Sequence, residues 1–200
     1  SPHTDSSAAS DVYKRQIVDI AGLVKGASKG EGLGNKFLAN IRETDAVIHV
    51  LRCFDDDNIT HVDGSVDPVR DKEIIDIELQ LKDLETVNNR LEKVKKTSKS
   101  GDKSSIEEFG VLEEVISHLE SSRSIRSISD EIKKKDHILK PLQLLTSKPV
   151  LYVCNVDEKS IVDGNNYVNS VIKLAEKENA QVISLAAGIE SEIQELESYN

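Results

Sequence analysis

The stretch IVDIAGLVKGASKGEGLGNKFLANIRETDAVIHVLRCF, residues 17–54, decides the fold of this chain. Its apolar run at residues 17–21 predicts a buried strand that ends beside a glycine. The four glycines from Gly26 to Gly34 predict a loop that is mobile or passes close to a ligand, because glycine lets the backbone adopt unusual angles. A strand followed directly by such a loop marks a candidate ligand-binding position at the end of the strand.

A second buried strand is predicted at residues 46–54, after a short helix at residues 36–42. This strand is nearly all apolar, which is typical of a parallel strand that is covered on both faces. Further strands are predicted at residues 149–155 and 181–185, with a helix at residues 165–178 between them. Strand and helix alternate on both sides of the middle of the chain, so we expect an α/β fold with a parallel sheet.

The middle of the chain changes to a helical period after Asp67, which is placed to cap a helix that begins at Pro68. Apolar residues alternate there by three and four, and one polar asparagine at an a-type position is of the kind that fixes register. This seam consists of Ile74, Ile77, Leu81, Leu84, Asn88 and Leu91. After a polar tip, the second seam consists of Phe109, Leu112, Ile116 and Leu119. The two seams predict an antiparallel coiled-coil hairpin inserted between two strands of the sheet.

Composition limits the classes of partner. The chain of 200 residues has a net charge of −10, so as a whole it would be repelled by nucleic acid and by anionic membranes. We therefore expect no DNA partner and no membrane partner, and any RNA contact needs a local basic patch. No apolar run approaches the roughly 20 residues of a membrane span, no signal peptide is visible, and we expect a cytoplasmic protein. Cys53 and Cys154 lie in apolar, strand-like runs and are expected to be buried, reduced thiols.

The sequence suggests four segments. Residues 1–16 are polar and serine-rich, and are expected to be a foreign or disordered tail, whether a translated adapter sequence or a natural extension. Residues 17–66 form the first part of the nucleotide-binding domain. Residues 67–135 form the coiled-coil helical insertion, and residues 136–200 form the second part of the domain. The chain contains no methionine, which favours a piece cut from a longer protein.

The first chemical motif is Asp19-Ile20-Ala21-Gly22 at a strand end. In P-loop nucleotidases an acidic residue at this place holds the Mg²⁺ ion that bridges the terminal phosphates, and a following glycine brings a backbone N–H near the γ-phosphate. An ordinary strand-end turn has the same spacing. The glycine-rich loop does not fit a dinucleotide fingerprint, because Asn35 stands where the third glycine is needed.

The second motif is Asn155-Val156-Asp157-Glu158, which follows the strand at residues 149–155. GTPases read guanine here with Asn-Lys-x-Asp, whereas this chain has Val156 and the longer acid Glu158, so a guanine-specific clamp is degraded. A helix cap followed by the first turn of a helix would also produce the pattern Asn-x-x-Glu. The third motif is the pair of small residues Ala186-Ala187 after the last strand, where GTPases contact the base through the backbone.

Taken together, the order of these motifs and the text around them resemble the Obg-like ATPase (YchF-type) family of P-loop GTPases and ATPases. The most specific stretches are residues 18–62, EIIDIELQLKDLETV at residues 73–87 and LLTSKPVLYVCNVDE at residues 144–158. The resemblance runs from about Ile17 to Glu197 and is weakest between residues 97 and 135. It implies a partial P-loop NTPase domain of the OBG type with an inserted helical hairpin.

The resemblance also implies functions for single residues. The family hydrolyses ATP, often also GTP, and associates with ribosomes. Asp19 would lie in the Mg²⁺ shell, through water, and Gly22 at the γ-phosphate. His61 would be the catalytic residue that orients the attacking water, because Leu23 replaces the glutamine of Ras-like enzymes. The base site would consist of Asn155, Val156, Glu158, Ala186 and Ala187. The altered base motif, matched here by Asn155 and Glu158, is associated with tolerance for adenine.

Several features depart from the family pattern. The phosphate-binding loop Gly-x-x-x-x-Gly-Lys-Ser/Thr is missing, and with it most of switch I and the C-terminal TGS domain. Without the first strands and helix, one side of the sheet would be uncovered and one strand edge unpaired. We expect the chain alone to neither bind nucleotide tightly nor hydrolyse it. The alternative is a truncated, non-enzymatic module whose coiled-coil arm binds a partner.

A basic cluster at the hairpin tip is the candidate contact with ribosomal RNA, although a solvated helix end would look the same. It consists of Lys93, Lys95, Lys96, Lys99 and Lys103. The sequence leaves open the preference for ATP or GTP, the ribosomal contact site, the physiological trigger, the oligomeric state and the origin of residues 1–16.

Overall fold

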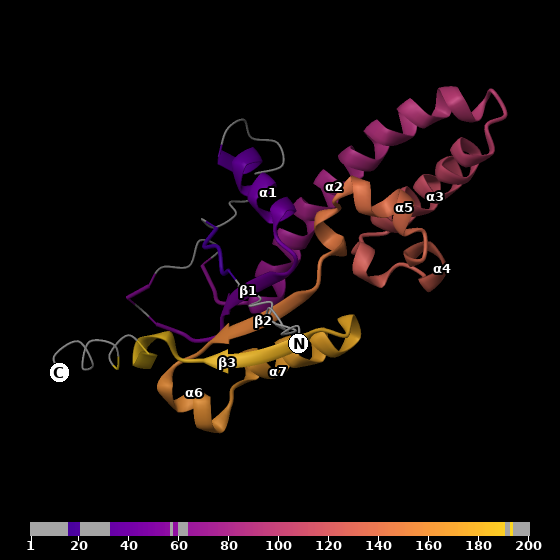
Figure 1. Ribbon diagram of the computed structural model, residues 1–200. Coiled ribbons are helices and arrows are strands. Elements are labelled where there is room, and N and C mark those ends of the chain that lie inside the picture. Colours follow the sequence, from indigo (N-terminus) through magenta and orange to yellow (C-terminus); the bar gives the residue numbers. More distant parts are fainter. Residues whose placement is uncertain (1–15, 21–32, 57, 60–63, 191–192, 194–200) are drawn as a thin grey trace, which may run out of the picture.

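The computed structural model describes residues 16–20, 33–56, 58–59, 64–190 and 193 of the chain, and its ribbon is shown in Figure 1. Its longer elements are α1 (Leu33–Glu43), β1 (Val47–Arg52), α2 (Pro68–Ser98), α3 (Lys103–Glu120), β2 (Val150–Asn155), α6 (Glu158–Asp163), α7 (Asn166–Glu178) and β3 (Gln181–Leu185). Short helical turns connect α3 to β2: η1 (Ile125–Ser127), α4 (Asp130–Lys133), α5 (Asp136–Leu139), η2 (Lys140–Leu142) and η3 (Leu145–Ser147). No helix in these described ranges is long and apolar enough to cross a membrane.

The three strands form a parallel sheet in the order β1-β2-β3, as predicted. Arg52, Asn155 and Leu185, the last residues of the strands, lie beside one another in register. The arrowheads in Figure 1 accordingly point the same way and end at one edge of the sheet. Whatever follows each strand is therefore brought together at this carboxyl edge, which is where ligands bind in open α/β sheets.

The expected strand at residues 17–21 is not formed in its described part, residues 16–20. Ile17 is 83% exposed and Val18 is 51% exposed, while Ile20 packs against the helix α1 cluster around Leu38 and Ile41. A strand needs a neighbour for its backbone hydrogen bonds, and the described ladder pairs β1 with β2 alone. The prediction of a buried strand here was wrong.

One face of the sheet is covered and the other is open among the described residues. Helix α7 packs against the covered face through Val168, Val171 and Ala175, which contact Tyr152 and Cys154 of β2. On the opposite face the exposed fractions are 50% for Ile48, 61% for Val50 and 48% for Ile183. The expectation that the strand at residues 46–54 is covered on both faces was therefore wrong for β1. On the same face, Val153 of the central strand β2 is only 4% exposed, so the expectation of one uncovered side stays a prediction.

The inserted helical hairpin is present between β1 and β2, and extends to the upper right of Figure 1. Helix α2 begins at Pro68, and the Asp67 carboxylate caps it by accepting from the N–H groups of Val69 and Arg70. Its hairpin core contains Val87 and Val94 from α2 and Leu112, Val115 and Leu119 from α3. A hairpin with its own core agrees with the prediction from the sequence.

The exact seam of α2 differs from the prediction. Val87 is fully buried, whereas Asn88, the predicted register-fixing residue, is exposed. Ile77 and Leu81 are 50% and 44% exposed, because α3 is shorter than α2 and packs against its later half. Leu84 and Leu91 do pack against the hairpin core as predicted. Heptad spacing located the helix correctly but assigned part of the wrong face to the core.

A buried carboxylate joins the hairpin to the sheet. Asp83 of α2 accepts hydrogen bonds from the Leu145 N–H (2.7 Å), the Thr146 N–H (2.8 Å) and the Thr146 hydroxyl (2.7 Å). The Thr146 hydroxyl oxygen also accepts from the Ile125 N–H. Asp83 therefore fixes the start of η3, which leads into β2, against the helix that follows β1.

Candidate functional site

The candidate site lies at the carboxyl edge of the sheet, where β2 and β3 end. The Asn155 backbone carbonyl accepts from the Cys53 N–H (2.8 Å), and the Val156 N–H donates to the Leu185 carbonyl (2.9 Å). These bonds extend the sheet by one step past its strands. They hold the residues of the second and third sequence motifs on adjacent, rigid backbones.

A side-chain hydrogen bond connects these two motifs. The Asn155 Oδ1 atom accepts from the Ala187 N–H at 3.1 Å. The two motifs are far apart in the sequence but meet in space, at the place that the resemblance assigns to the nucleotide base. With Oδ1 held by the backbone, the amide NH₂ of Asn155 is directed elsewhere and is available as a donor.

The remaining residues of the predicted base site have different exposures. Glu158 is exposed in the first turn of α6, where its carboxylate can accept from a ligand. Ala187 is also exposed, whereas Ala186 is 5% exposed. Val156 is 3% exposed and packs in the core with Val168, so its side chain does not face the site. The role of Val156 beside the base stays a prediction, and it would have to act through its backbone.

Asp157, between these residues, caps α6. Its carboxylate accepts from the Ser160 N–H at 2.8 Å, and hydrogen bonds from the Ser160 backbone and hydroxyl hold the pKa of Asp157 below its ordinary value. The cap fixes the direction in which α6 leaves β2 and hence the position of Glu158. The motif Asn-x-x-Glu thus contains a helix cap in addition to its candidate base-reading residues.

The loop after β1 is organised by Arg52, a residue that the motif analysis did not single out. Its guanidinium donates to the carbonyls of Phe54, Asp56 and Ile59 at 3.0–3.3 Å and lies over the Phe54 ring. An arginine at the end of an otherwise apolar strand was the signal in the sequence. The loop is also fixed to α7, because the Asn165 amide donates to the Cys53 carbonyl.

The first motif is only partly within the described residues. Asp19 is exposed, and its carboxylate is accessible to a ligand. Mg²⁺ is often bound by one or two carboxylates together with waters and substrate phosphates, so a lone exposed aspartate fits such an ion. Gly22 and the predicted catalytic His61 lie outside the described residues.

The two cysteines are free and fully buried, as expected. Hydrogen bonding with Cys154 and burial raise the pKa of Cys53, so its thiol stays protonated at neutral pH. Both residues belong to the core cluster under α7.

Comparison with known proteins shows what this chain is similar to. The family model of 50S ribosome-binding GTPases matches residues 3–97. The ribosome-binding ATPase YchF of Bacillus subtilis is 51% identical over 184 residues, which are 91% of this chain and 50% of that protein. The proteins of the same name from Haemophilus ducreyi and Escherichia coli O157:H7 are 50% and 46% identical over 182 residues, again 91% of this chain and 50% of theirs.

A solved structure agrees with these matches. The Schizosaccharomyces pombe YchF GTPase superposes with a TM-score of 0.71 at 38% identity, over 86% of this chain and 47% of that chain. The chain thus spans about half the length of the curated relatives that it matches. The match supports the P-loop NTPase type of fold that the resemblance implied.

Proposed function

Since 91% of the chain is similar to YchF proteins at 46–51% identity, we propose that it belongs to the Obg-like, YchF-type family of P-loop nucleotidases. In this proposal it supplies the base-reading side of a switch that hydrolyses ATP, with GTP as a second substrate. The observation that carries the proposal is the hydrogen bond from the Ala187 N–H to Asn155 Oδ1, because it joins the two base-reading motifs. This contact adds a side-chain connection to the backbone pairing that already places the two motifs on adjacent strands.

In this proposal the base is read by hydrogen bonds and backbone contacts. The free NH₂ of Asn155 donates to an acceptor of the base, while the exposed Glu158 carboxylate accepts from an amino group. Adenine offers its exocyclic amine to such an acceptor, and guanine offers both an N1–H and an amine. The longer side chain of Glu158 makes recognition of the base less specific than an aspartate would, which supports acceptance of both nucleotides.

The phosphate side of the reaction is assigned by the resemblance. Asp19 would bind Mg²⁺ through water, and the ion would neutralise charge on the terminal phosphates when bound. Gly22 would approach the γ-phosphate through its backbone. His61 would act as the group that orients the attacking water, since Leu23 cannot accept a proton or a hydrogen bond through its side chain.

A ribosomal partner and a cytoplasmic location are part of the same proposal. The curated relatives carry the words "ribosome-binding" in their names. The contact assigned here is the hairpin tip between α2 and α3, where the exposed Lys93, Lys96 and Lys99 extend away from the sheet. These side chains would contact RNA phosphates rather than bases.

A second candidate function is a non-enzymatic interaction module. The hairpin has its own buried core, with Leu112 and Val115 fully buried, so the arm can present its tip without nucleotide. In this case ribosome binding would persist when the base-reading residues are changed. One experiment can therefore distinguish the nucleotidase from the non-enzymatic module.

The experiment compares two proteins: the 200-residue chain, and the product of its source gene extended on both sides to the length of the curated relatives. We expect Mg²⁺-dependent ATP hydrolysis from the extended protein, a loss of about tenfold or more in kcat/KM with Asn155→Ala, and no turnover by the chain alone above its Asp19→Ala variant. Turnover by the extended protein that is unchanged in Asp19→Ala would reject the magnesium role. Absence of turnover together with intact ribosome binding would favour the module.

A further inference from the structure

A second site lies away from the base-reading edge. A pocket of about 650 Å³ opens between α2, the segment 122–127 after α3, and the later half of α7. Its α7 wall ends at Glu178, which precedes β3, whereas the base-reading groups lie at the carboxyl ends of β2 and β3. The volume is within the roughly 300–1,000 Å³ that is typical of small-molecule sites.

The floor of this pocket is a balanced ionic cluster. Lys72, 4% exposed, pairs with Asp76 Oδ2 at 2.7 Å and with Glu178. Arg126 lies 4.0 Å from Asp76, and the Tyr152 hydroxyl donates to Glu178 at 2.6 Å. Two cations thus face two carboxylates, so the floor needs no additional counter-ion. It is a rigid base that connects the hairpin to the sheet.

One polar group on the pocket wall has no partner. Gln80 is 8% exposed and lines the pocket. Within the part of the chain that the structure describes, no hydrogen bond is formed by its amide. The amide atoms of Gln80 still reach the solvent, so this side chain can donate to and accept from a ligand that enters the pocket.

The rim of the pocket is basic on an acidic protein. Arg123, Lys173 and Lys177 are exposed around it, and none of the three forms an ion pair in the described residues. Lys173 and Lys177 are one helical turn apart on α7, on the same face. Glu73 is the only acid on this rim, so the local charge is positive although the chain carries −10. Such a rim attracts a small anion.

The pocket also contains apolar surface. Ile77 is 50% exposed there, and Leu174 of α7 lines the opposite wall. We propose that the pocket binds a small phosphorylated molecule, with its phosphate at Arg123, Lys173 and Lys177 and a hydroxyl or amide group against Gln80. This binding is separate from nucleotide hydrolysis and does not depend on the base-reading residues.

The test uses the complete 200-residue chain with ribose 5-phosphate and inorganic pyrophosphate as probes, at constant ionic strength and without metal. These probes carry no base, so the nucleotide-reading edge is not engaged. Two-dimensional NMR follows the side-chain amide signals of Gln80, which are assigned by their absence in Gln80→Leu. We expect ribose 5-phosphate to shift these signals and pyrophosphate to occupy the rim alone.

Variants that remove lysine charges distinguish binding at this pocket from general electrostatic attraction of the phosphate to the protein. We expect Lys173→Gln/Lys177→Gln to weaken ribose 5-phosphate binding about tenfold or more. The matched control, Lys93→Gln/Lys96→Gln at the hairpin tip, removes the same charge and should stay within about twofold. Asn155→Ala should leave binding unchanged, which separates this result from the proposed function. Equal weakening by both lysine pairs, unmoved Gln80 signals, or binding of an acidic peptide but of neither phosphate would overturn the proposal.

Discussion

Replacement of Asp83 by asparagine tests how the hairpin is attached to the sheet. The carboxylate is fully buried and accepts three hydrogen bonds, one at Oδ1 and two at Oδ2. Asparagine has nearly the same shape but only one acceptor oxygen. If that oxygen keeps both bonds to Thr146, the new NH₂ group faces the Leu145 N–H, and two buried donors oppose each other.

The size of the effect follows from two opposing contributions. Loss of one hydrogen bond to a charged group costs about 1.5–3 kcal/mol, and unsatisfied buried donors add to this cost. Burial raises the pKa of Asp83 despite the hydrogen bonds from Thr146 and Leu145, so neutralising the charge relieves some desolvation. We expect Asp83→Asn to lower the free energy of unfolding by about 2–3 kcal/mol, a large part of a typical total of roughly 5–15 kcal/mol.

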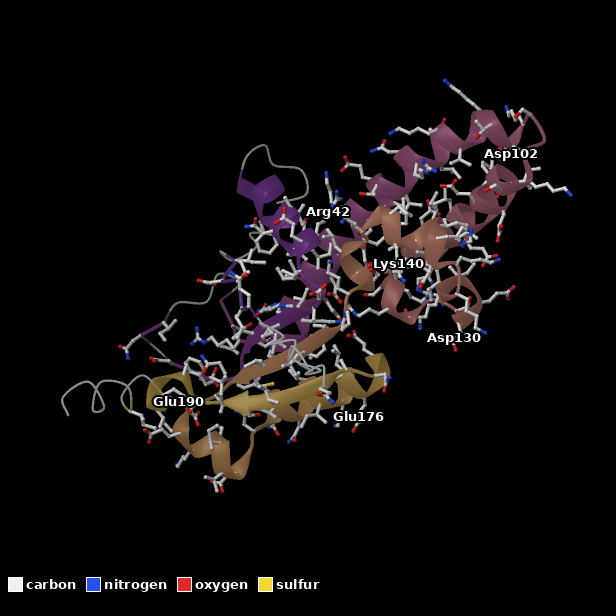
Figure 2. The ribbon with its side chains drawn as sticks, viewed as in Figure 1. Arg42, Asp102, Asp130, Lys140, Glu176 and Glu190 are labelled. Carbon is white, nitrogen blue, oxygen red and sulfur yellow. The ribbon has the colours of Figure 1, made fainter. Side chains whose placement is uncertain are left out.

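Urea unfolding at neutral pH, followed by circular dichroism of the helices, measures this change. With a slope of about 1–3 kcal/mol per molar urea, the midpoint should fall by roughly 1 M. The matched control is Asp130→Asn, at the position labelled in Figure 2, because the Asp130 side chain is 89% exposed and its contact with Lys133 is long at 3.5 Å. That variant should change stability by less than about 0.5 kcal/mol. Equal midpoints for Asp83→Asn and the native chain would refute the attachment role of Asp83.

Three further expectations concern other contacts. Asn155→Ala removes the acceptor for the Ala187 N–H and should cost about 1 kcal/mol in urea unfolding; an unchanged midpoint would show that this bond does not hold the loop. Burial lowers the pKa of His49 below 6.5, so the unfolded chain takes up the proton first and stability falls as the pH drops below about 6.5. His49→Gln should flatten that part of the stability–pH curve, and an unaltered curve would exclude His49 as its source. Arg90→Ala breaks an exposed pair with Glu108 and should cost less than about 1 kcal/mol, with a smaller cost in high salt; a cost that does not change with salt would argue against an ionic origin.

The sequence predicted elements better than it predicted burial. The strand at residues 181–185 and the helix around residues 165–178 agree with β3 and α7 nearly to the residue, because their caps and periods are local. The seam of α2 was partly wrong, since heptad spacing cannot tell that α3 ends before it reaches Ile77. Which face of a long helix is buried depends on the length of its partner, and that is not a local property.

For the candidate site, too, the sequence predicted positions better than side-chain surroundings. Asn155 and Ala187 were identified by their positions after strands, and the parallel register brings them into contact. Val156 was placed beside the base, but strand alternation turns its side chain into the core. Arg52 and Gln80 were missed because their significance lies in what surrounds them. Arg52 is surrounded by three loop carbonyls, and Gln80 lines a pocket that forms only in the folded chain.

The insertion of the hairpin between β1 and β2 has a consequence for the order of folding. Val47 pairs with Val150, and the whole of α2 and α3 lies between them in the sequence. Closing so long a loop is entropically costly, whereas the two helices are joined by a short turn and contact each other locally. Early formation of the hairpin would shorten the effective loop and deliver η3 to Asp83, next to the start of β2. The hairpin of α2 and α3 would then also bring β1 and β2 together during folding.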